Sequence, residues 1–326
     1  MHAIRQLGFG PAETLRYERV DDPVPGPGQV RVAVRAAGVH LLDASVRAGY
    51  PGVPFPLPSL PMVPGQEGAG VVDSVGPGVD PAWLGEAVVT HLGLASGGYA
   101  ELIVREASAL HVIPPGMAPE CAVAMVGTGR TALGVLDVAL PSEADVVLVT
   151  AAAGGVGNLL VQAAHHAGAT VVAAAGGRAK LARLCGLGAD VTVDYSAPGW
   201  PETAREALNG REVTVVVDGV GSALGRDALG LLGFGGRFIQ YGWSAGAPTE
   251  IGTEDLRGRA LTATLAVGPS LLRRPGGLRA LEEAAIAEAA RDRLRPLVQS
   301  FPLAEAAKAH LALENRETVG KVVLVP

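Results

Sequence analysis

The sequence has few of the residues that mark disulfide-rich, nucleic-acid-binding or membrane proteins. Two of its 326 residues are cysteines, Cys121 and Cys185, which cannot form a disulfide framework or a four-cysteine zinc site. Charged residues make up 18% and the formal net charge is −6, which argues against a nucleic-acid or anionic-membrane surface. We find no charged-then-apolar leader at Met1–Gln6, and no apolar run of the roughly 20 residues that a membrane helix needs. We therefore expect a soluble, cytoplasmic protein.

Aromatic residues are also scarce, at 4%, but hydrophobic residues reach 48%, and the chain is long enough for about two domains. The first third carries short β-like runs such as Gln29–Arg35 and Gly70–Val75, separated by turn residues, which predicts an irregular, barrel-like β domain. Prolines fill one stretch, which we interpret as an extended loop. They are Pro51, Pro54, Pro56, Pro58, Pro61 and Pro64.

From about Met125, strand-like runs alternate with segments of helical length. This order predicts a parallel sheet with crossover helices. The expected strands are Val146–Thr150, Thr170–Ala175, Val191–Asp194, Val213–Asp218, Arg237–Tyr241 and Leu261–Leu265, and the expected helices include Ala179–Leu187, Ala223–Leu232 and Leu278–Ala290. A final run, Lys321–Val325, comes too late to extend this sheet comfortably, so we predict that it returns to the first domain.

The most informative stretch is Asp145–Asn158, in which an apolar run enters a glycine-rich turn before a predicted helix, Val156–Ala167. In the dinucleotide pattern G-x-G-x-x-G, Ala152 takes the first place and Gly154 and Gly157 the others. Such a turn brings backbone N–H groups and a helix N-terminus to a pyrophosphate. An ordinary strand–turn–helix with glycines for packing is the alternative, and the surrounding strand–helix series favours the dinucleotide.

The second strand of this series indicates which dinucleotide. NAD enzymes carry a carboxylate about 20 residues after the first glycine, where it binds the ribose 2′-hydroxyl. Here the strand ends in Gly176-Gly177 with no acid, and Arg178 and Lys180 follow. A missing acid and two cations suit the 2′-phosphate of NADPH, because arginine can bind phosphate with two hydrogen bonds. A solvated helix face is the alternative role of the two cations.

A set of motifs in fixed order resembles a known family. The motifs are Ala36–Asp43, Val63–Val72, Gly97–Glu101, Gly129–Ala132, Ala151–Gly157, Asp194-Tyr195, Gly235–Phe238 and Val319–Leu324. Together they resemble the medium-chain dehydrogenase/reductase superfamily, in its zinc-free quinone oxidoreductase (zeta-crystallin-like) branch. One motif would mean little, but the ordered set spans nearly the whole chain.

The resemblance implies an α/β fold in which a Rossmann doubly wound parallel sheet is inserted into a GroES-like, β-barrel-type catalytic domain. We place the catalytic domain at residues 1–124 plus 267–326 and the NADPH-binding domain at 125–266. The resemblance also implies a homodimer joined through the nucleotide domain. Taking the resemblance together with the residues discussed above, we predict that NADPH is bound by Thr131, Ala153, Gly154, Gly155, Val156, Gly157, Gly176, Arg178, Lys180, Tyr195, Gly242 and Trp243.

Zinc-dependent relatives in this superfamily carry a cysteine, a His-Glu pair and a later cysteine. Here the matching places hold His40, Gln66-Glu67 and, by our alignment of the motifs, Gly127. His40 and Glu67 could bind a metal, but glutamine is a poor zinc ligand and glycine offers none, whereas a catalytic zinc needs three protein ligands. We therefore predict no metal, with Cys121 near Gly127 as the remaining doubt.

Without zinc, the feasible reaction is hydride delivery to an acceptor that is already activated, such as a quinone or an α,β-unsaturated carbonyl. His40 is the sharpest candidate proton or hydrogen-bond donor, with a structural imidazole as its alternative, and the branch usually has asparagine there. Asp43 is expected to orient local backbone. Tyr50 and Trp243 are expected at the substrate, or else pack as ordinary side chains. An enoyl-thioester or aldehyde reductase, or a non-catalytic NADPH-binding sensor, is the alternative function.

Overall fold

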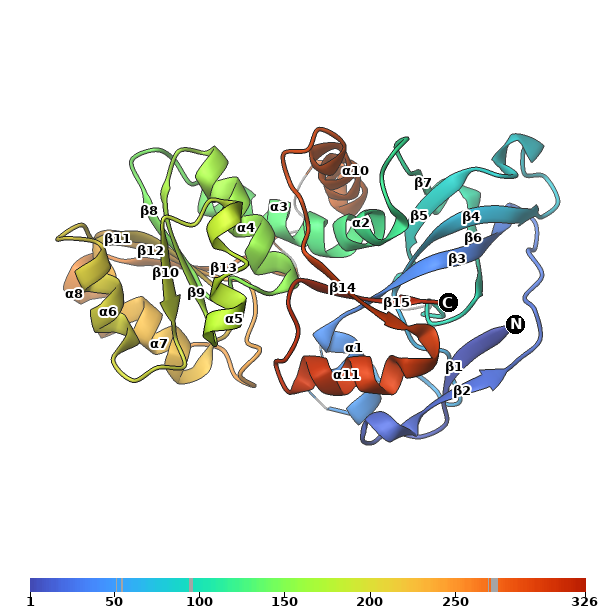
Figure 1. Ribbon diagram of the computed structural model, residues 1–326, viewed down its shortest axis with the longest axis horizontal. Helices are drawn as coiled ribbons and strands as arrows, with labels where there is room; N and C mark the ends of the chain where they lie inside the picture. The colour runs from blue at the N-terminus through green and yellow to red at the C-terminus, as the bar shows by residue number, and fades with distance from the viewer. Residues whose placement is uncertain (51, 54, 94–95, 269, 271–274) are drawn as a thin grey trace. The chain divides into compact units, whose positions relative to one another are not determined.

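The computed structural model describes residues 1–50, 52–53, 55–93, 96–268, 270 and 275–326. Pro51 and Pro54 of the proline-rich stretch lie outside the described residues, and the other four prolines there lie outside helices and strands. The chain forms two compact units, drawn in Figure 1. The first combines Met1–Gly127 with Leu297–Pro326, and the second is Thr128–Pro296.

The first unit is built on a mixed sheet whose longest strand, β3, pairs with β4, β6 and β15. The order is β14 (Val298–Pro302), β15 (Lys321–Val325), β3 (Gln29–Val39), β4 (Glu67–Val75), β5 (Ala87–His91) and β7 (His111–Val112), with β6 (Leu102–Glu106) also on β3. The early part of β3 pairs with β6 and its end pairs with β15. The last strand of the chain therefore returns to the first unit, which confirms that prediction.

The core of this unit follows from the alternation in β3, where Val30, Val32 and Val34 are buried and the residues between them are less so. A separate antiparallel pair, β1 (His2–Gln6) and β2 (Leu15–Arg19), completes its strands. The α-helices among the described residues of this unit are α1 (Leu41–Ala48), α2 (Pro119–Ala124) and α11 (Ala306–Glu314). Helix α1 begins directly where β3 ends, which places His40 at the junction.

The second unit contains a six-stranded parallel sheet in the order β10-β9-β8-β11-β12-β13. The strands are β8 (Val146–Val149), β9 (Thr170–Ala175), β10 (Val191–Asp194), β11 (Val213–Asp218), β12 (Leu232–Gln240) and β13 (Thr262–Leu265). Their continuous apolar, β-branched runs suit strands that are covered on both faces. In chain order this is 3-2-1-4-5-6, the Rossmann order, so the predicted α/β fold class is confirmed.

Helices cover both faces of this sheet, as Figure 1 shows. One face carries α6 (Trp200–Ala207), α7 (Ser222–Gly230) and α8 (Thr253–Arg259). Helices α3 (Arg130–Ala139) and α4 (Gly155–His166) also pack on the sheet, and α5 (Arg178–Leu181) lies beside β9 and β10. The single helix predicted at 179–187 is instead α5 and a short 3₁₀ turn at Cys185–Leu187. Two glycines, Gly186 and Gly188, weaken helix propensity there.

The unit boundaries differ from those placed on the sequence. The described residues between 267 and 296, assigned above to the catalytic domain, belong to the second unit. The reason is α10 (Gly277–Ala290), which packs against α3. An ion pair between Arg130 Nη1 and Glu282 Oε1, at 2.5 Å, joins the two helices. An alanine-rich helix carries no sequence signal that says which unit it covers.

The helical run Pro119–Ala139 is long and apolar enough, by length and composition, to cross a membrane. This helix corrects the expectation that no apolar run of the chain reaches the length of a membrane helix. Of the qualifying window, 61% is buried inside the folded chain. Burial against protein is the behaviour of a core helix, and most of this window is covered in that way.

Candidate functional site

The carboxyl ends of the parallel strands form the first candidate site. In open α/β sheets, ligands bind beyond these ends, next to the point where strand order reverses. Here that point lies between β8 and β11. The segments after β10, β9, β8, β11 and β12 therefore follow one edge of the sheet, and most of the predicted NADPH-binding residues fall in them.

The turn between β8 and α4 takes the shape that the glycine pattern predicts. Its left-handed residue is Ala151, with φ 48°, while Ala152 is fully buried and donates its N–H to the Ala174 carbonyl. Gly157 is required, because a Cβ there would lie 2.2 Å from the Ala151 carbonyl oxygen. Helix α4 begins at Gly155, so the first-turn N–H groups of Gly155 to Gly157 have no acceptor within the helix.

At the end of β9, Gly176 and Gly177 lead directly into α5, whose first residues include Arg178 and Lys180. Tyr195 follows β10 and its ring lies against Gly176: a Cβ on that glycine would come within 3.3 Å of the ring. The structure thus brings these predicted 2′-phosphate residues to one corner of the sheet edge. Arg178 is exposed, and Lys180 and Tyr195 are partly buried.

Sequence reasoning missed a carboxylate near this corner. Asp194, at the end of β10, accepts hydrogen bonds from the N–H groups of Gly177 and Ser196, each at 3.0 Å, and from the Ser196 hydroxyl. The hydroxyl and the backbone donors lower the pKa of Asp194 despite the small opposing effect of burial. The carboxylate is therefore charged but bound to backbone, where it shapes the turn. The sequence signal that could have revealed this carboxylate was the Asp194-Tyr195 motif, in which only the tyrosine was assigned a role above.

The loops after β11 and β12 lie side by side. Ser244 donates its N–H to the Gly219 carbonyl, and Gly242 lies so close that a Cβ would meet Gly219 oxygen at 3.2 Å. Asp218 organises both loops from a fully buried position. Its carboxylate accepts hydrogen bonds from Thr150, Val220, Gly221, Gln240 and Thr249.

Two further predicted cofactor residues belong to this unit. Trp243 is 39% exposed in the loop after β12, so its ring is available to a ligand, and Thr131 is partly buried in the first turn of α3. Asp218 was counted above only as the end of a strand. A buried acid followed by glycine after a parallel strand was the signal that could have revealed its organising role.

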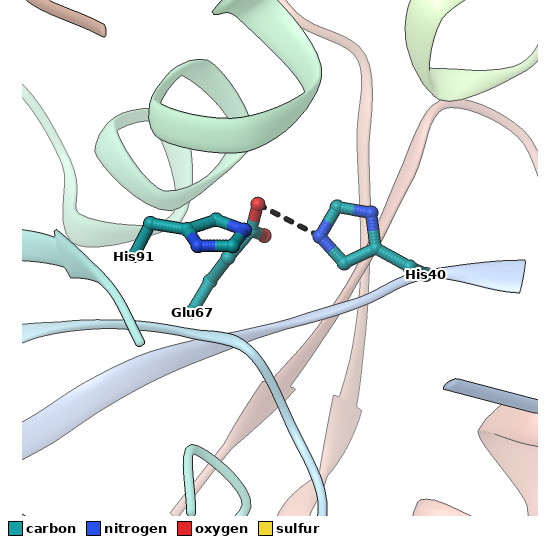
Figure 2. A group of neighbouring side chains, drawn as sticks. All are labelled: His40, Glu67 and His91. Carbon is teal, nitrogen blue, oxygen red and sulfur yellow. Dashed lines mark ion pairs between the residues drawn. The ribbon is translucent and has the colours of Figure 1, made fainter. Parts of the chain in front are cut away.

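A second group of polar side chains lies in the first unit, at the ends of four neighbouring strands. His40 comes one residue beyond the pair Val39–Val322 of β3 and β15, so it lies opposite Lys321. Glu67 and His91 are register partners in β4 and β5. Figure 2 shows the imidazole of His40 pointing at the Glu67 carboxylate, with His91 beside that carboxylate.

Glu67 lies at the centre of this group and is fully buried. Its Oε1 is 2.7 Å from His40 Nε2 and its Oε2 is 2.8 Å from Lys321 Nζ. Burial acts to raise the pKa of Glu67, but the charges of His40 and Lys321, the hydrogen bond from His40 and the charge of His91 outweigh it. The pKa of Glu67 is therefore held well below its usual range, and the carboxylate is ionised.

His40 Nε2 also lies 3.0 Å from Lys321 Nζ. One ring nitrogen cannot both donate to the carboxylate and accept from the ammonium. His40 Nε2 therefore makes one of these two hydrogen bonds at a time. The other nitrogen, Nδ1, is turned away from Glu67 (Figure 2). The side chain of His40 is 25% exposed, so the imidazole is anchored on one side and accessible on the other.

His40, Glu67 and His91 are the group of potential metal ligands that the described part of the chain brings together, with one ligand atom from each within 4.8 Å of the others. Zinc does not fit this arrangement, because the Lys321 ammonium already contacts Glu67 and His40. Gly127 offers no fourth ligand. A Cβ there would lie 1.5 Å from Glu67 Oε1, so the carboxylate fills the space that a cysteine would need.

Asp43 lies beneath His40 in a buried network. Its Oδ2 accepts hydrogen bonds from the His40 backbone N–H at 2.8 Å and from the Tyr99 hydroxyl at 3.1 Å. Burial raises the pKa of Asp43, and the nearby His40 opposes that shift. Tyr99 also lies 3.0 Å from Nε2 of the buried His310. Asp43 therefore fixes the backbone that presents His40.

Among the described residues, no hydrogen bond or ion pair joins the side chain of Tyr50 or Gln66 to His40, Glu67 or His91. Tyr50 follows α1, is half-exposed and has its ring over Gly52. Gln66 borders a pocket beside Asp43. The pocket is lined by Gln6, Asp43, Val46, Phe55, Pro56, Pro58, Met62, Pro64, Gly65, Gln66 and Ser96.

Comparison with known proteins agrees with this architecture. Residues 26–115 match the family described as alcohol dehydrogenase GroES-like domain, and residues 155–273 match zinc-binding dehydrogenase. The chain is 33% identical to a 2-haloacrylate reductase of Burkholderia sp., covering 100% of this chain and 99% of that one. It is 32% identical to a quinone oxidoreductase of Pseudomonas aeruginosa, covering 99% of each.

Among solved structures, Escherichia coli quinone oxidoreductase complexed with NADPH is similar over the full length of both chains, with a TM-score of 0.87 and 27% identity. The chain therefore belongs to the medium-chain dehydrogenase/reductase superfamily, in its zinc-free quinone oxidoreductase branch.

Proposed function

We propose that the protein is an NADPH-dependent reductase that transfers hydride to a quinone or an α,β-unsaturated carbonyl compound without a metal. The observation that carries the proposal is the corner at the end of β9, where Gly176-Gly177 leads into Arg178 and Lys180 beside Tyr195. A carboxylate in that place would bind the 2′-hydroxyl of NAD, whereas two cations and a phenol suit a phosphate.

The remaining cofactor residues follow from the sheet edge. The N–H groups of Gly155, Val156 and Gly157 would hold the pyrophosphate at the N-terminus of α4, next to Ala153 and Gly154. Gly242 lets the backbone after β12 approach a ligand, and Trp243 would cover it. Thr131 would approach the nicotinamide. Bound NADPH supplies the hydride, and the protein's part is to orient it and to handle a proton.

His40 is our candidate for the residue that donates that proton. When hydride adds to the β-carbon of an enone, negative charge develops on the carbonyl oxygen, and a donor there stabilises it. Because His40 Nε2 faces Glu67 and Lys321, a donated hydrogen bond or proton leaves from Nδ1. Asp43, which binds the His40 backbone N–H, holds the ring in place. Tyr50 is a further candidate, half-exposed at the end of α1.

The named relatives support an activated carbon–carbon double bond or a quinone as the acceptor. A 2-haloacrylate carries an alkene conjugated to a carboxylate, and a quinone carries one conjugated to a carbonyl. Both accept hydride without a Lewis acid more readily than a simple aldehyde does. An enoyl-thioester or aldehyde reductase is the alternative enzyme, and an NADPH-binding sensor is the alternative outside catalysis.

We also propose a homodimer joined through the nucleotide-binding unit. Strand β13 is the last of the parallel sheet, pairs with β12 alone among the described strands, and has all four residues exposed. An open strand edge with exposed apolar Leu265 is a surface that a second copy can cover.

Hydride transfer is tested with NADPH carrying deuterium at the nicotinamide C4 position. We expect one deuterium at the β-carbon of a small enone, located by NMR of the product, and we expect His40→Ala to lower kcat while the Kd for NADPH stays unchanged. Stoichiometric NADPH binding with no deuterium in any quinone, enone or haloacrylate product would favour the sensor and contradict the proposal.

A further inference from the structure

The cluster around Glu67 has the ligand composition of a metal site. Two histidines and one glutamate are a set that zinc uses in catalytic sites, with an open fourth position. His40, Glu67 and His91 supply one atom each within 4.8 Å. A fully buried carboxylate needs a nearby positive charge, because an isolated buried charge is strongly destabilising. Either a bound metal ion or a charged side chain could supply the positive charge that Glu67 requires.

Lys321, a residue of the chain itself, supplies the positive charge beside Glu67. It is 3% exposed, and its Nζ lies 2.8 Å from Glu67 Oε2 and 3.0 Å from His40 Nε2. The sheet makes room for this contact at Gly38, between the two strands. A Cβ on Gly38 would lie 2.0 Å from Glu67 Oε2 and 2.9 Å from Lys321 Cε. The ion pair therefore crosses β3 at a residue without a side chain.

The charge of the cluster also opposes a metal ion while Lys321 is present. The His91 ring is held in the cluster by a backbone hydrogen bond, in which its Nδ1 accepts the Gly93 N–H at 3.0 Å. The Glu67 carboxylate and the Lys321 ammonium already balance each other's charge. Adding a divalent ion beside Lys321 would leave two buried positive charges uncompensated.

We propose that the Lys321 ammonium takes the place of a metal ion in the His40–Glu67–His91 cluster, so that the chain carries its own cation and excludes zinc. The consequence is that a divalent-metal site is latent in this protein. Removing the ammonium while keeping the apolar stem should uncover it. The site would then hold Zn²⁺ or Co²⁺ on His40, Glu67 and His91, with an overall charge of one positive unit.

The test compares Lys321→Met with the wild type and with Lys308→Met, which removes an exposed lysine of α11 as a matched control. Each chelator-treated protein is titrated with Co²⁺ by visible absorption and dialysed against Zn²⁺ for metal analysis. We expect Lys321→Met to bind about one metal ion per chain with tetrahedral-type Co²⁺ bands, and to gain thermal stability with Zn²⁺. We expect neither effect in the wild type or in Lys308→Met.

A second substitution identifies the ligands. Adding His91→Ala or His40→Ala to Lys321→Met should remove the bound metal. Lys321→Gln replaces the methionine variant if that one does not fold. The proposal is contradicted if wild type binds one Zn²⁺ per chain through these histidines, or if a folded Lys321 variant takes up no metal. None of these readouts depends on reductase activity, so the proposal stands or falls separately from the proposed function.

Discussion

At the scale of the residue, the cofactor proposal depends on a few charged side chains at the end of β9. The sequence showed both cations and the missing acid, because these are features of a short local segment. It did not show that Tyr195 would lie over Gly176, since that contact joins two strands. It also did not show the hydrogen bonds by which Asp194 shapes the Gly177 turn.

We expect Arg178→Ala combined with Lys180→Ala to raise the Kd for NADPH and to leave that for NADH nearly unchanged. A charge-assisted hydrogen bond contributes about 1.5–3 kcal/mol, so each lost contact should cost about tenfold to a hundredfold in NADPH affinity. Fluorescence titration with both nucleotides measures this. Arg183→Ala, an exposed arginine just beyond α5, is the control. Equal losses for both nucleotides would refute the 2′-phosphate assignment.

The buried His310 should make stability depend on pH. Burial and the nearby charge of Arg47 lower the pKa of His310 to about 3. Between about pH 6.5 and 3 the unfolded chain therefore binds a proton that the folded chain does not, and stability falls as pH falls. At pH 5 this loss is about 2 kcal/mol.

We expect the free energy of unfolding to fall less steeply from pH 7 to 5 in His310→Gln than in the wild type, measured by urea denaturation. His166→Gln, an exposed histidine on α4, should keep the wild-type slope. Identical slopes in all three proteins would show that His310 is not the group that titrates.

At the scale of the element, regular structure was largely predictable where a strand is a buried apolar run. β9, β10, β11 and β15 have the bounds expected from sequence, because each is a short run of largely apolar residues. The placement of α10 was not predictable, since an alanine-rich helix fits several surfaces. The His40 cluster was also hidden. Its members come from four separate strands, and only a lysine opening a buried strand hinted at a partner for Glu67.

The turn between β8 and α4 should tolerate no side chain at Gly157. We expect Gly157→Ala to reduce stability by about 1–3 kcal/mol and to weaken NADPH binding, because the new Cβ would force the Ala151 carbonyl away. Calorimetry with and without NADPH measures both effects. Gly186→Ala, where a Cβ meets nothing within 4 Å, should change neither. Unchanged NADPH affinity in Gly157→Ala would place the pyrophosphate elsewhere.

At the scale of the whole molecule, the chain was divisible from sequence into two domains, but the exact boundary was not. The described residues between 267 and 296 belong to the second unit through α10 and its ion pair to Arg130. The return of β15 to the first unit was predictable, because an isolated strand after the end of the parallel series needs a different sheet. Assembly was not visible in the pattern of residues and came only from the resemblance.

We expect the wild-type protein to sediment as a dimer and Leu265→Lys to shift it toward monomer, because a charge on β13 opposes edge-to-edge pairing. Analytical ultracentrifugation distinguishes the two states. Leu140→Lys introduces the same change at another exposed leucine of this unit and should leave the dimer intact. A monomeric wild type would rule the dimer out.

The central claim is that this protein reduces activated acceptors with NADPH and without metal. The most direct measurement follows NADPH absorbance with a panel of quinones, enones, 2-haloacrylates, enoyl thioesters and aldehydes, using enzyme treated with a chelator. We predict turnover with quinones, enones or haloacrylates that is faster with NADPH than with NADH and unaffected by the chelator. Turnover confined to aldehydes or thioesters, or activity that is lost with the chelator and restored by Zn²⁺, would contradict the account.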